Sequence, residues 1–343
     1  MRKLLNTLYI TSEDAYLSLK GETVCVEIGE KLAGRIPLHT LESIISFSYI
    51  GASPALMGAC AEKGINLSLF SPYDKFLCRV VGVDRGNVLL RKRQYRISDD
   101  AKQSCMIARN FIFGKVYNSR WNINRSVRDH EMRLNVERCR DTENRLAEAL
   151  PIIRAQEDLD RLRGIEGECA SVYFSVFNEL ILNQKDEFFF QERNKRPPLD
   201  NVNAMLSFIY TILANDCAAA LEGVGLDSYV GFMHRDRPGR KSLALDLMEE
   251  LRSVLADRFV LTLINNKQVK ASDFVKTDSN AVEFTDEGRK KILTAWQEHK
   301  KEEITHPYLK EKVSWGLVPH VQALLLARFL RDDLDEYPPF LWK

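Results

Sequence analysis

The sequence contains no long hydrophobic run and no paired cysteines. No stretch approaches eighteen consecutive apolar residues, and the N-terminal residues lack the apolar core of a secretion signal. We therefore expect a cytoplasmic protein that does not enter a membrane. The seven cysteines are odd in number and form no Cys-x-x-Cys pair, which argues against a zinc site and a disulfide framework. We expect reduced thiols, most of them buried.

The chain also lacks a net charge of either sign. Its 343 residues include 49 lysines and arginines and 48 aspartates and glutamates, so the formal net charge is +1. This balance identifies no partner by itself. A hydrophobic content of 45% at this length is sufficient for one large core or two ordinary cores.

Strand-like segments occupy the beginning of the sequence, and helical periodicity occupies the rest. Runs rich in β-branched and aromatic residues predict strands at Ala15–Leu19, Val24–Val26, Arg35–Leu38, Ser43–Phe47, Asn66–Phe70 and Leu77–Val83. A short helix is expected at Pro54–Lys63, where Gly64 ends it. Apolar residues at spacings of three and four predict helices near 101–122, 125–148, 155–182, 203–222, 242–257, 287–301 and 317–334.

These elements predict an α+β fold. We expect a small, mainly-β N-terminal domain at residues 1–83, a linker at 84–100 and a larger all-α domain at 101–343. The candidate catalytic residues described below all lie in the all-α domain, which we therefore expect to be the catalytic one. The acidic and aromatic tail, Asp332–Lys343, either docks on a partner or packs on its own chain.

The segment Gly225–Arg252 combines one histidine, a basic loop and an acidic helix. His234 is followed by four basic residues, Arg235, Arg237, Arg240 and Lys241. In the next helix, a rotation of about 100° per residue places Asp246, Glu249 and Glu250 within about 100° of one another. The rest of this helix is apolar, so we expect it to be packed on several sides.

The acidic arc on this helix has two interpretations. It is the ordinary solvated face of an amphipathic helix, or it faces a positive charge. A divalent metal completed by the imidazole of His234 would supply that charge.

A further acidic residue lies in the apolar stripe of Leu159–Leu182. The stripe is formed by Leu159, Leu162, Cys169, Tyr173 and Val176, and Glu166 fills the gap in it. An unpaired charge in such a core-facing position is expensive. Glu166 therefore has two interpretations: it forms a salt bridge with an arginine, or it binds a metal.

Positive charge is concentrated between Arg79 and Arg128. Twelve lysines and arginines, Arg91 and Arg93 among them, stand against three aspartates, an excess of nine positive charges. Tyr117 is interleaved with them, which suits phosphate contacts with occasional base stacking. We favour a nucleic-acid partner; the alternative is a helix face that pairs with acids elsewhere in the chain.

Two stretches, RGIEGECASVYF and GLDSYVGFMHRDRPGRKSLALDLMEELR, resemble the CRISPR-associated nuclease–integrase, the catalytic subunit of the spacer-acquisition complex. The resemblance covers the whole length of the chain. Around His234, the sequence is closest to the version of the family found in type I, subtype C systems. Ser253 departs from the pattern, because the family often has proline there.

The resemblance implies a metal site with Mg²⁺ or Mn²⁺. In the family, a glutamate in a G-x-E-G helix, a histidine in a G-F-x-H turn and an acid in an S-L-A-x-D-L-x-E/D helix bind the metal. By motif position these are Glu166, His234 and Glu249. Asp246, one turn earlier, would be a further ligand or a proton acceptor. The loop cations Arg235, Arg237, Arg240 and Lys241 would hold phosphates.

The resemblance also implies a function and partners. The expected activity is metal-dependent DNA cleavage and insertion of short DNA spacers into a CRISPR array by 3′-hydroxyl attack. Expected partners are double-stranded DNA, as spacer precursors and as the leader–repeat, a second copy of the chain, and the small second CRISPR adaptation protein.

Two other functions remain open. The chain can be a non-enzymatic DNA-binding scaffold, in which the acidic helix only balances the basic loop. A helical zinc hydrolase acting on small phosphates fits the ligands, but it leaves the basic stretch unexplained.

Overall fold

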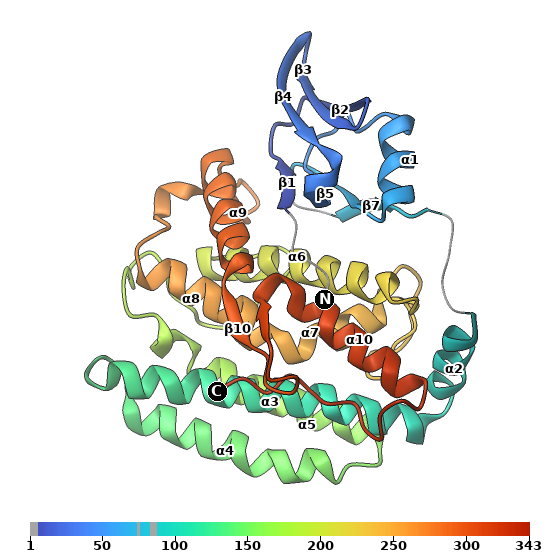
Figure 1. Cartoon of the computed structure of the whole chain (residues 1–343). Coiled ribbons are helices and arrows are strands. Elements are labelled where there is room, and N and C mark those ends of the chain that lie inside the picture. The colour runs from blue at the N-terminus through green and yellow to red at the C-terminus, as the bar shows by residue number, and fades with distance from the viewer. Residues whose placement is uncertain (1–5, 74–75, 83–87) are drawn as a thin grey trace. The chain divides into compact units, whose positions relative to one another are not determined.

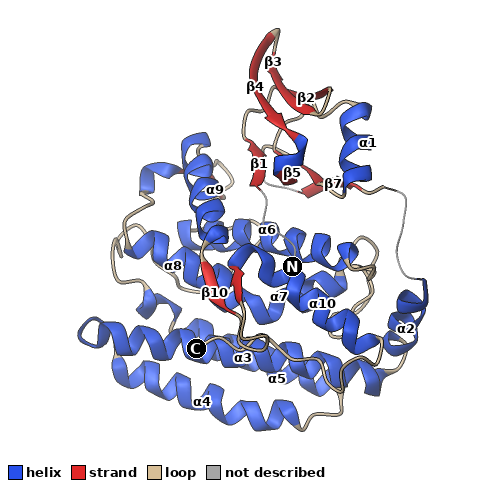
Figure 2. Ribbon diagram, viewed as in Figure 1, coloured by secondary structure: helices blue, strands red, loops and turns tan. Residues whose placement is uncertain are grey.

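The computed structural model describes residues 6–73, 76–82 and 88–343. Contacts divide it into two compact units, and the part of each unit that is described has its own core. Unit 1 joins residues 1–85 to 284–302, and unit 2 comprises 86–283 and 303–343. A strand-rich N-terminal region precedes a mostly helical one, which confirms the expected α+β fold class (Figures 1 and 2).

Unit 1 contains two sheets and a capped helix. The four-stranded sheet has the order β1 (Asn6–Ile10), β5 (Leu41–Ser46), β6 (Asn66–Phe70) and β7 (Phe76–Val80), with β7 antiparallel to its neighbour. The second sheet is the antiparallel meander β2 (Ala15–Lys20), β3 (Thr23–Ile28) and β4 (Lys31–Pro37). Helix α1 (Pro54–Lys63) ends at Gly64, which has a left-handed conformation at φ 69°, as the sequence predicts.

Helix α9 (Asp286–Lys301) belongs to unit 1, although it lies more than 200 residues after β6 in the sequence. Arg289 of this helix donates to the carbonyl oxygen of Pro72, and its guanidinium lies 5.4 Å from the ring centroid of Phe47. The all-α domain predicted for 101–343 includes α9. The sequence shows the apolar stripe of α9, but it does not show that this stripe packs into the core of unit 1.

Unit 2 is built from helices. They are α2 (Val88–Ser98), α3 (Ala101–His130), α4 (Val136–Arg154), α5 (Leu159–Ser175), α6 (Asn201–Gly223), α7 (Ser242–Leu251), α8 (Arg258–Asn265) and α10 (Val318–Leu330). Two short strand pairs accompany them: β8 (Phe274–Lys276) with β9 (Val282–Phe284), and β10 (Glu303–Thr305) with β11 (Lys312–Ser314). Within this unit, α3 packs against α4, α5 and α7 (Figure 1).

Three predicted boundaries in this region differ from the structure. Residues 88–98 of the expected linker form α2, while the predicted boundary at residue 83 lies outside the described residues. Helix α3 continues to His130, so the predicted break after residue 122 is wrong. Asn122, a weak helix former, is buried there and donates to the hydroxyl of Tyr173 at 2.8 Å. After α7, the segment Arg252–Asp257 is a π-helical turn.

Helix α6 is long and apolar enough to cross a membrane, judged by length and composition. However, 72% of its most apolar window is buried inside the protein, which is typical of a core helix. Six of the seven cysteines are buried and all are free thiols, as expected.

The C-terminal tail packs on its own chain, which decides between the two predicted alternatives. Asn118 of α3 donates to the carbonyl oxygen of Phe340 at 2.7 Å and accepts from the amide of Trp342 at 2.8 Å. Glu250 of α7 accepts from the amide of Phe340 at 2.9 Å and from the hydroxyl of Tyr337. The tail is therefore bound through side chains of two helices of unit 2.

His306 anchors the tail from the other side. It is fully buried, and its ring centroid lies 5.4 Å from that of Phe340. Its Nδ1 accepts from the amides of Tyr308 and Leu309, and its Nε2 lies 3.1 Å from Oε1 of Gln322. An accepting Nδ1 requires the neutral ring, and burial lowers the pKa of His306 to about 4.

We expect acid to weaken unit 2 through His306. The folded pKa of about 4 lies below the ordinary value of 6.5. The stabilisation is therefore complete above about pH 6.5 and is lost as the pH falls towards 4. Relative to His306→Gln, the wild type should lose up to about 3 kcal/mol of unfolding free energy over this window. Urea unfolding at several pH values measures this difference; a difference that does not change with pH would contradict the prediction.

Candidate active site

His234 is held in one orientation by Asp246 of α7. The carboxylate of Asp246 is fully buried and accepts from the backbone amides of Phe232, Met233 and His234 at 2.7, 2.9 and 3.0 Å. It also accepts from Nδ1 of His234 at 2.6 Å. Because Nδ1 carries the shared proton, Nε2 is the nitrogen that can bind a ligand.

The turn before His234 requires glycine. A Cβ atom at Gly231 would lie 2.8 Å from Oδ2 of Asp246 and 2.8 Å from Cβ of Ser242. The glycine of the G-F-x-H pattern therefore lets the turn approach α7 closely enough for its amides to reach Asp246.

Glu249 lies one turn further along α7 and contacts two cations. Its Oε1 lies 2.9 Å from Nη2 of Arg252, and its Oε2 lies 2.7 Å from Nζ of Lys115 on α3. Burial by itself raises the pKa of Glu249, but Arg252 and Lys115 favour the charged form and bring the pKa down to about 2. Lys115 also contacts Oε1 of Glu166 on α5. One ammonium group thus joins the two predicted carboxylate ligands.

Glu166, His234 and Glu249 line one pocket. They come from α5, from the turn before α7 and from α7 itself, and the pocket has a volume of about 410 Å³ and opens to solvent. The remaining lining residues are mostly cationic: Ile112, Arg163, Met233, Arg235, Arg237 and Arg240. The structure therefore brings all three predicted metal ligands and three of the predicted phosphate-binding arginines into the lining of one pocket.

The other predicted site residues do not line this pocket. Both oxygens of Asp246 are engaged by the turn, so a positioning role follows from the geometry, whereas a ligand or proton-acceptor role does not. Lys241 precedes α7 outside the pocket lining. On α2, Arg91 donates to the carbonyl oxygen of Gly225 at 3.2 Å. The exposed Arg93 lies 3.0 Å from Asp332.

Three cations of the site were not singled out in the sequence. Arg163 stands one turn before Glu166 and Arg252 one turn after Glu249, so helical spacing marks both of them. Lys115 is one of the twelve basic residues between Arg79 and Arg128, and no local pattern distinguishes it from the others. Of the other members, Arg85 lies outside the described residues.

The two glycines of the G-x-E-G pattern do not serve close packing of α5. A Cβ atom at Gly164 or Gly167 would meet no other atom within 4 Å. The side of α5 that carries them faces open space.

The donor set suits a divalent metal, but the donors are not gathered around one point. Within residues 6–73, 76–82 and 88–343, no three His, Cys, Asp or Glu side chains are arranged to hold an ion. Among these described residues, Oε2 of the buried Glu249 has the ammonium of Lys115 as its partner at 2.7 Å, which is the place a metal would take. Two carboxylates and an imidazole Nε2 at one pocket fit Mg²⁺ or Mn²⁺, with Lys115 between the carboxylates.

The sequence is similar to known CRISPR-associated proteins. Residues 8–298 match the family model described as CRISPR associated protein Cas1. The chain is 50% identical over 347 residues to the CRISPR-associated endonuclease Cas1 2 of Rhodospirillum rubrum, and the alignment covers 100% of both chains.

Solved structures share the fold. A casposase bound to integration product superposes with a TM-score of 0.84 at 20% identity, covering 99% of this chain and 95% of that one. A Cas6-RT-Cas1–Cas2 complex has a TM-score of 0.80 at 20% identity, covering 100% of this chain and 36% of that one. At this identity the likeness shows the fold alone.

We expect opposite effects from alanine at two glycines of the site. Gly231→Ala should lower the unfolding free energy by about 1–3 kcal/mol, because its Cβ overlaps Asp246 and Ser242. Gly167→Ala should raise it by about 0.5–1 kcal/mol, because α5 has room there and alanine favours a helix. Urea unfolding of both variants measures the effects. Equal effects at the two positions would contradict the described turn.

Proposed function

Because the chain belongs to the family of the CRISPR-associated protein Cas1, we propose that it is a metal-dependent DNA endonuclease and integrase of CRISPR adaptation. It would insert short DNA spacers into the CRISPR array. The observation that carries this proposal is the convergence of Glu166, His234 and Glu249 at one pocket lined by arginines.

Glu166, Glu249 and Nε2 of His234 would hold Mg²⁺ or Mn²⁺. When bound, the ion would stabilise the negative charge that develops on phosphate oxygens during phosphoryl transfer and would make the attacking hydroxyl more acidic. Asp246 keeps Nε2 directed away from the turn by binding Nδ1.

The arginines of the pocket would bind the DNA backbone on both sides of the reacting phosphate. Arg235 is 67% exposed and lies 2.8 Å from Asp160, a surface ion pair that a phosphate can replace at little cost. Among the described residues that line the pocket there is no Ser, Thr, Tyr or Cys. This supports direct attack by a DNA 3′-hydroxyl, without a covalent protein–DNA intermediate.

The proposed partners are double-stranded DNA, a second copy of this chain and the small second adaptation protein. Support comes from the structural neighbours, since one is titled as bound to an integration product and another as a complex with Cas2. We assign the chain to type I, subtype C systems on the wording around His234, and to the cytoplasm.

A non-enzymatic scaffold has one observation in its favour. Both acidic ligands are already paired with cations, Glu166 with Lys115 and Glu249 with Lys115 and Arg252. However, the scaffold hypothesis requires the acidic helix to pair with the basic loop, and neither Lys115 nor Arg252 belongs to that loop.

The deciding experiment is strand transfer of a short duplex into a plasmid carrying a leader and repeat. The second adaptation protein is supplied, and the reaction is run with Mn²⁺ or with EDTA. We expect Glu166→Ala to lower Mn²⁺-dependent joining at least about 100-fold while DNA binding persists, because a ligand is lost. Glu168→Ala, an exposed acid two positions along α5, is the matched control and should join normally. If wild type binds DNA but joins none, the scaffold hypothesis is correct.

Removing the charge of Asp246 tests how His234 is positioned. Asp246→Asn should lower joining by about 100-fold, because the amide cannot accept every hydrogen bond that now orients the ring. Nitrogen NMR of His234 should show loss of the protonated Nδ1 signal. The exposed Asp236→Asn is the control in the same loop. An unchanged ring tautomer together with lost joining would contradict the positioning role.

A further inference from the structure

Lys115 is a buried lysine at the centre of the site. Its exposed fraction is 6%, and its ammonium contacts Glu166 and lies 2.7 Å from Oε2 of Glu249. The two glutamates come from different helices, α5 and α7, whereas Lys115 belongs to α3. The ammonium group therefore lies where the carboxylates of these helices meet.

A lysine and a divalent ion cannot share this place at low cost. Both are attracted by the same two carboxylates. Two cations that contact the same carboxylates are close together, and they repel each other strongly in a partly buried site. Glu249 already has Arg252 on its other oxygen at 2.9 Å. Binding of an ion by Glu166 and Glu249 therefore requires the ammonium of Lys115 to move.

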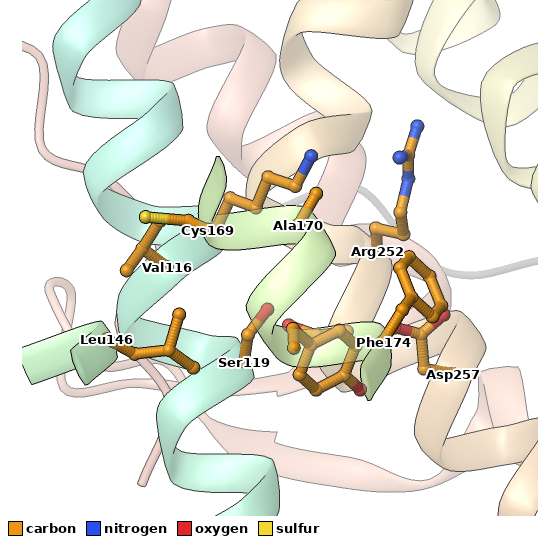
Figure 3. A pocket seen from close by; sticks show the side chains of 11 residues that line it. Val116, Ser119, Leu146, Cys169, Ala170, Phe174, Arg252 and Asp257 are labelled. Atoms are coloured by element: carbon orange, nitrogen blue, oxygen red, sulfur yellow. The ribbon is translucent and has the colours of Figure 1, made fainter. Parts of the chain in front are cut away.

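A second cavity lies beside Lys115. This cavity is narrow, and Figure 3 shows Ser119, Arg252 and Asp257 among the side chains around it. Ser253 lines the same cavity. Its buried Oγ has no hydrogen-bond partner in the described part of the chain. A buried polar atom without a partner is unfavourable. The Oγ of Ser253 would gain a partner if the ammonium of Lys115 moved into this cavity when a metal is bound.

We propose that Lys115 is a positioning residue with two places. Without metal, its ammonium lies between Glu166 and Glu249 and holds α5 and α7 together. When the divalent ion binds, the ammonium moves into the narrow cavity, towards Ser119, Ser253 and the carboxylate of Asp257, with Arg252 also in the lining. Lys115 thereby opposes metal binding. In the metal-free protein, it keeps the two negatively charged carboxylates from moving apart. This inference rests on the metal dependence of the proposed function.

The test measures Mn²⁺ binding and thermal unfolding of the DNA-free protein. Mn²⁺ is titrated and the free ion is counted by electron paramagnetic resonance. Lys115→Met, which keeps the length but not the charge, should bind Mn²⁺ at least ten-fold more tightly than wild type. Its melting temperature should fall in EDTA and return to the wild-type value in saturating Mn²⁺. Lys102→Met, an exposed lysine on the same helix, is the matched control and should change neither quantity.

Several outcomes would overturn the inference. Unchanged or weaker Mn²⁺ binding by Lys115→Met, or an equal fall in melting temperature with and without the ion, would show a purely structural lysine. If that variant does not fold, Lys115→Arg decides, because its larger charged group does not fit the narrow cavity and should weaken Mn²⁺ binding about ten-fold. Wild-type affinity in this variant would also overturn the inference. If wild type itself binds no Mn²⁺, the proposed metal-dependent function fails as well.

Discussion

Three carboxylates on one buried helix are the constraint on which unit 2 depends. Asp246, Glu249 and Glu250 of α7 are all buried, and an unpaired charge in such a place is very unfavourable. Each carboxylate therefore needs partners of its own. These come from three directions: the turn before α7, the helix α3 and the C-terminal tail. Helix α7 is thereby connected to most of the elements around the pocket.

The partners decide what each carboxylate can do. Both carboxylate oxygens of Asp246 accept hydrogen bonds from the turn that carries His234, and one of them orients its ring. Glu250 faces away from the pocket and binds the tail, and burial raises its pKa to about 7. Glu249 alone of the three lines the pocket, where cations keep it charged. Three acids within one arc of a helix thus have separate roles, and a helical-wheel projection does not distinguish them.

Close approach of the backbone makes this arrangement possible. At Gly114 of α3, a Cβ atom would lie 2.9 Å from Cβ of Glu250 and 3.3 Å from Cβ of Pro339. The missing side chain lets α3, α7 and the tail meet at one point. The same helix α3 brings Asn118 to the tail and Lys115 to Glu166 and Glu249, so the tail and the pocket share one common element.

The sequence by itself determined the features that neighbouring residues encode. Strand and helix periodicity predicted the α+β fold class, and local turn chemistry predicted the end of α1 at Gly64. The motifs selected three residues that line one pocket, Glu166, His234 and Glu249. Tertiary structure alone decided which core receives α9, that the tail packs on its own chain, and that Lys115 joins the two glutamates. Lys115 precedes Glu166 by 51 residues, and nothing near it distinguishes it from other cations of the basic stretch. Such contacts depend on how distant helices pack, and local periodicity shows which face of a helix is buried but not what it meets.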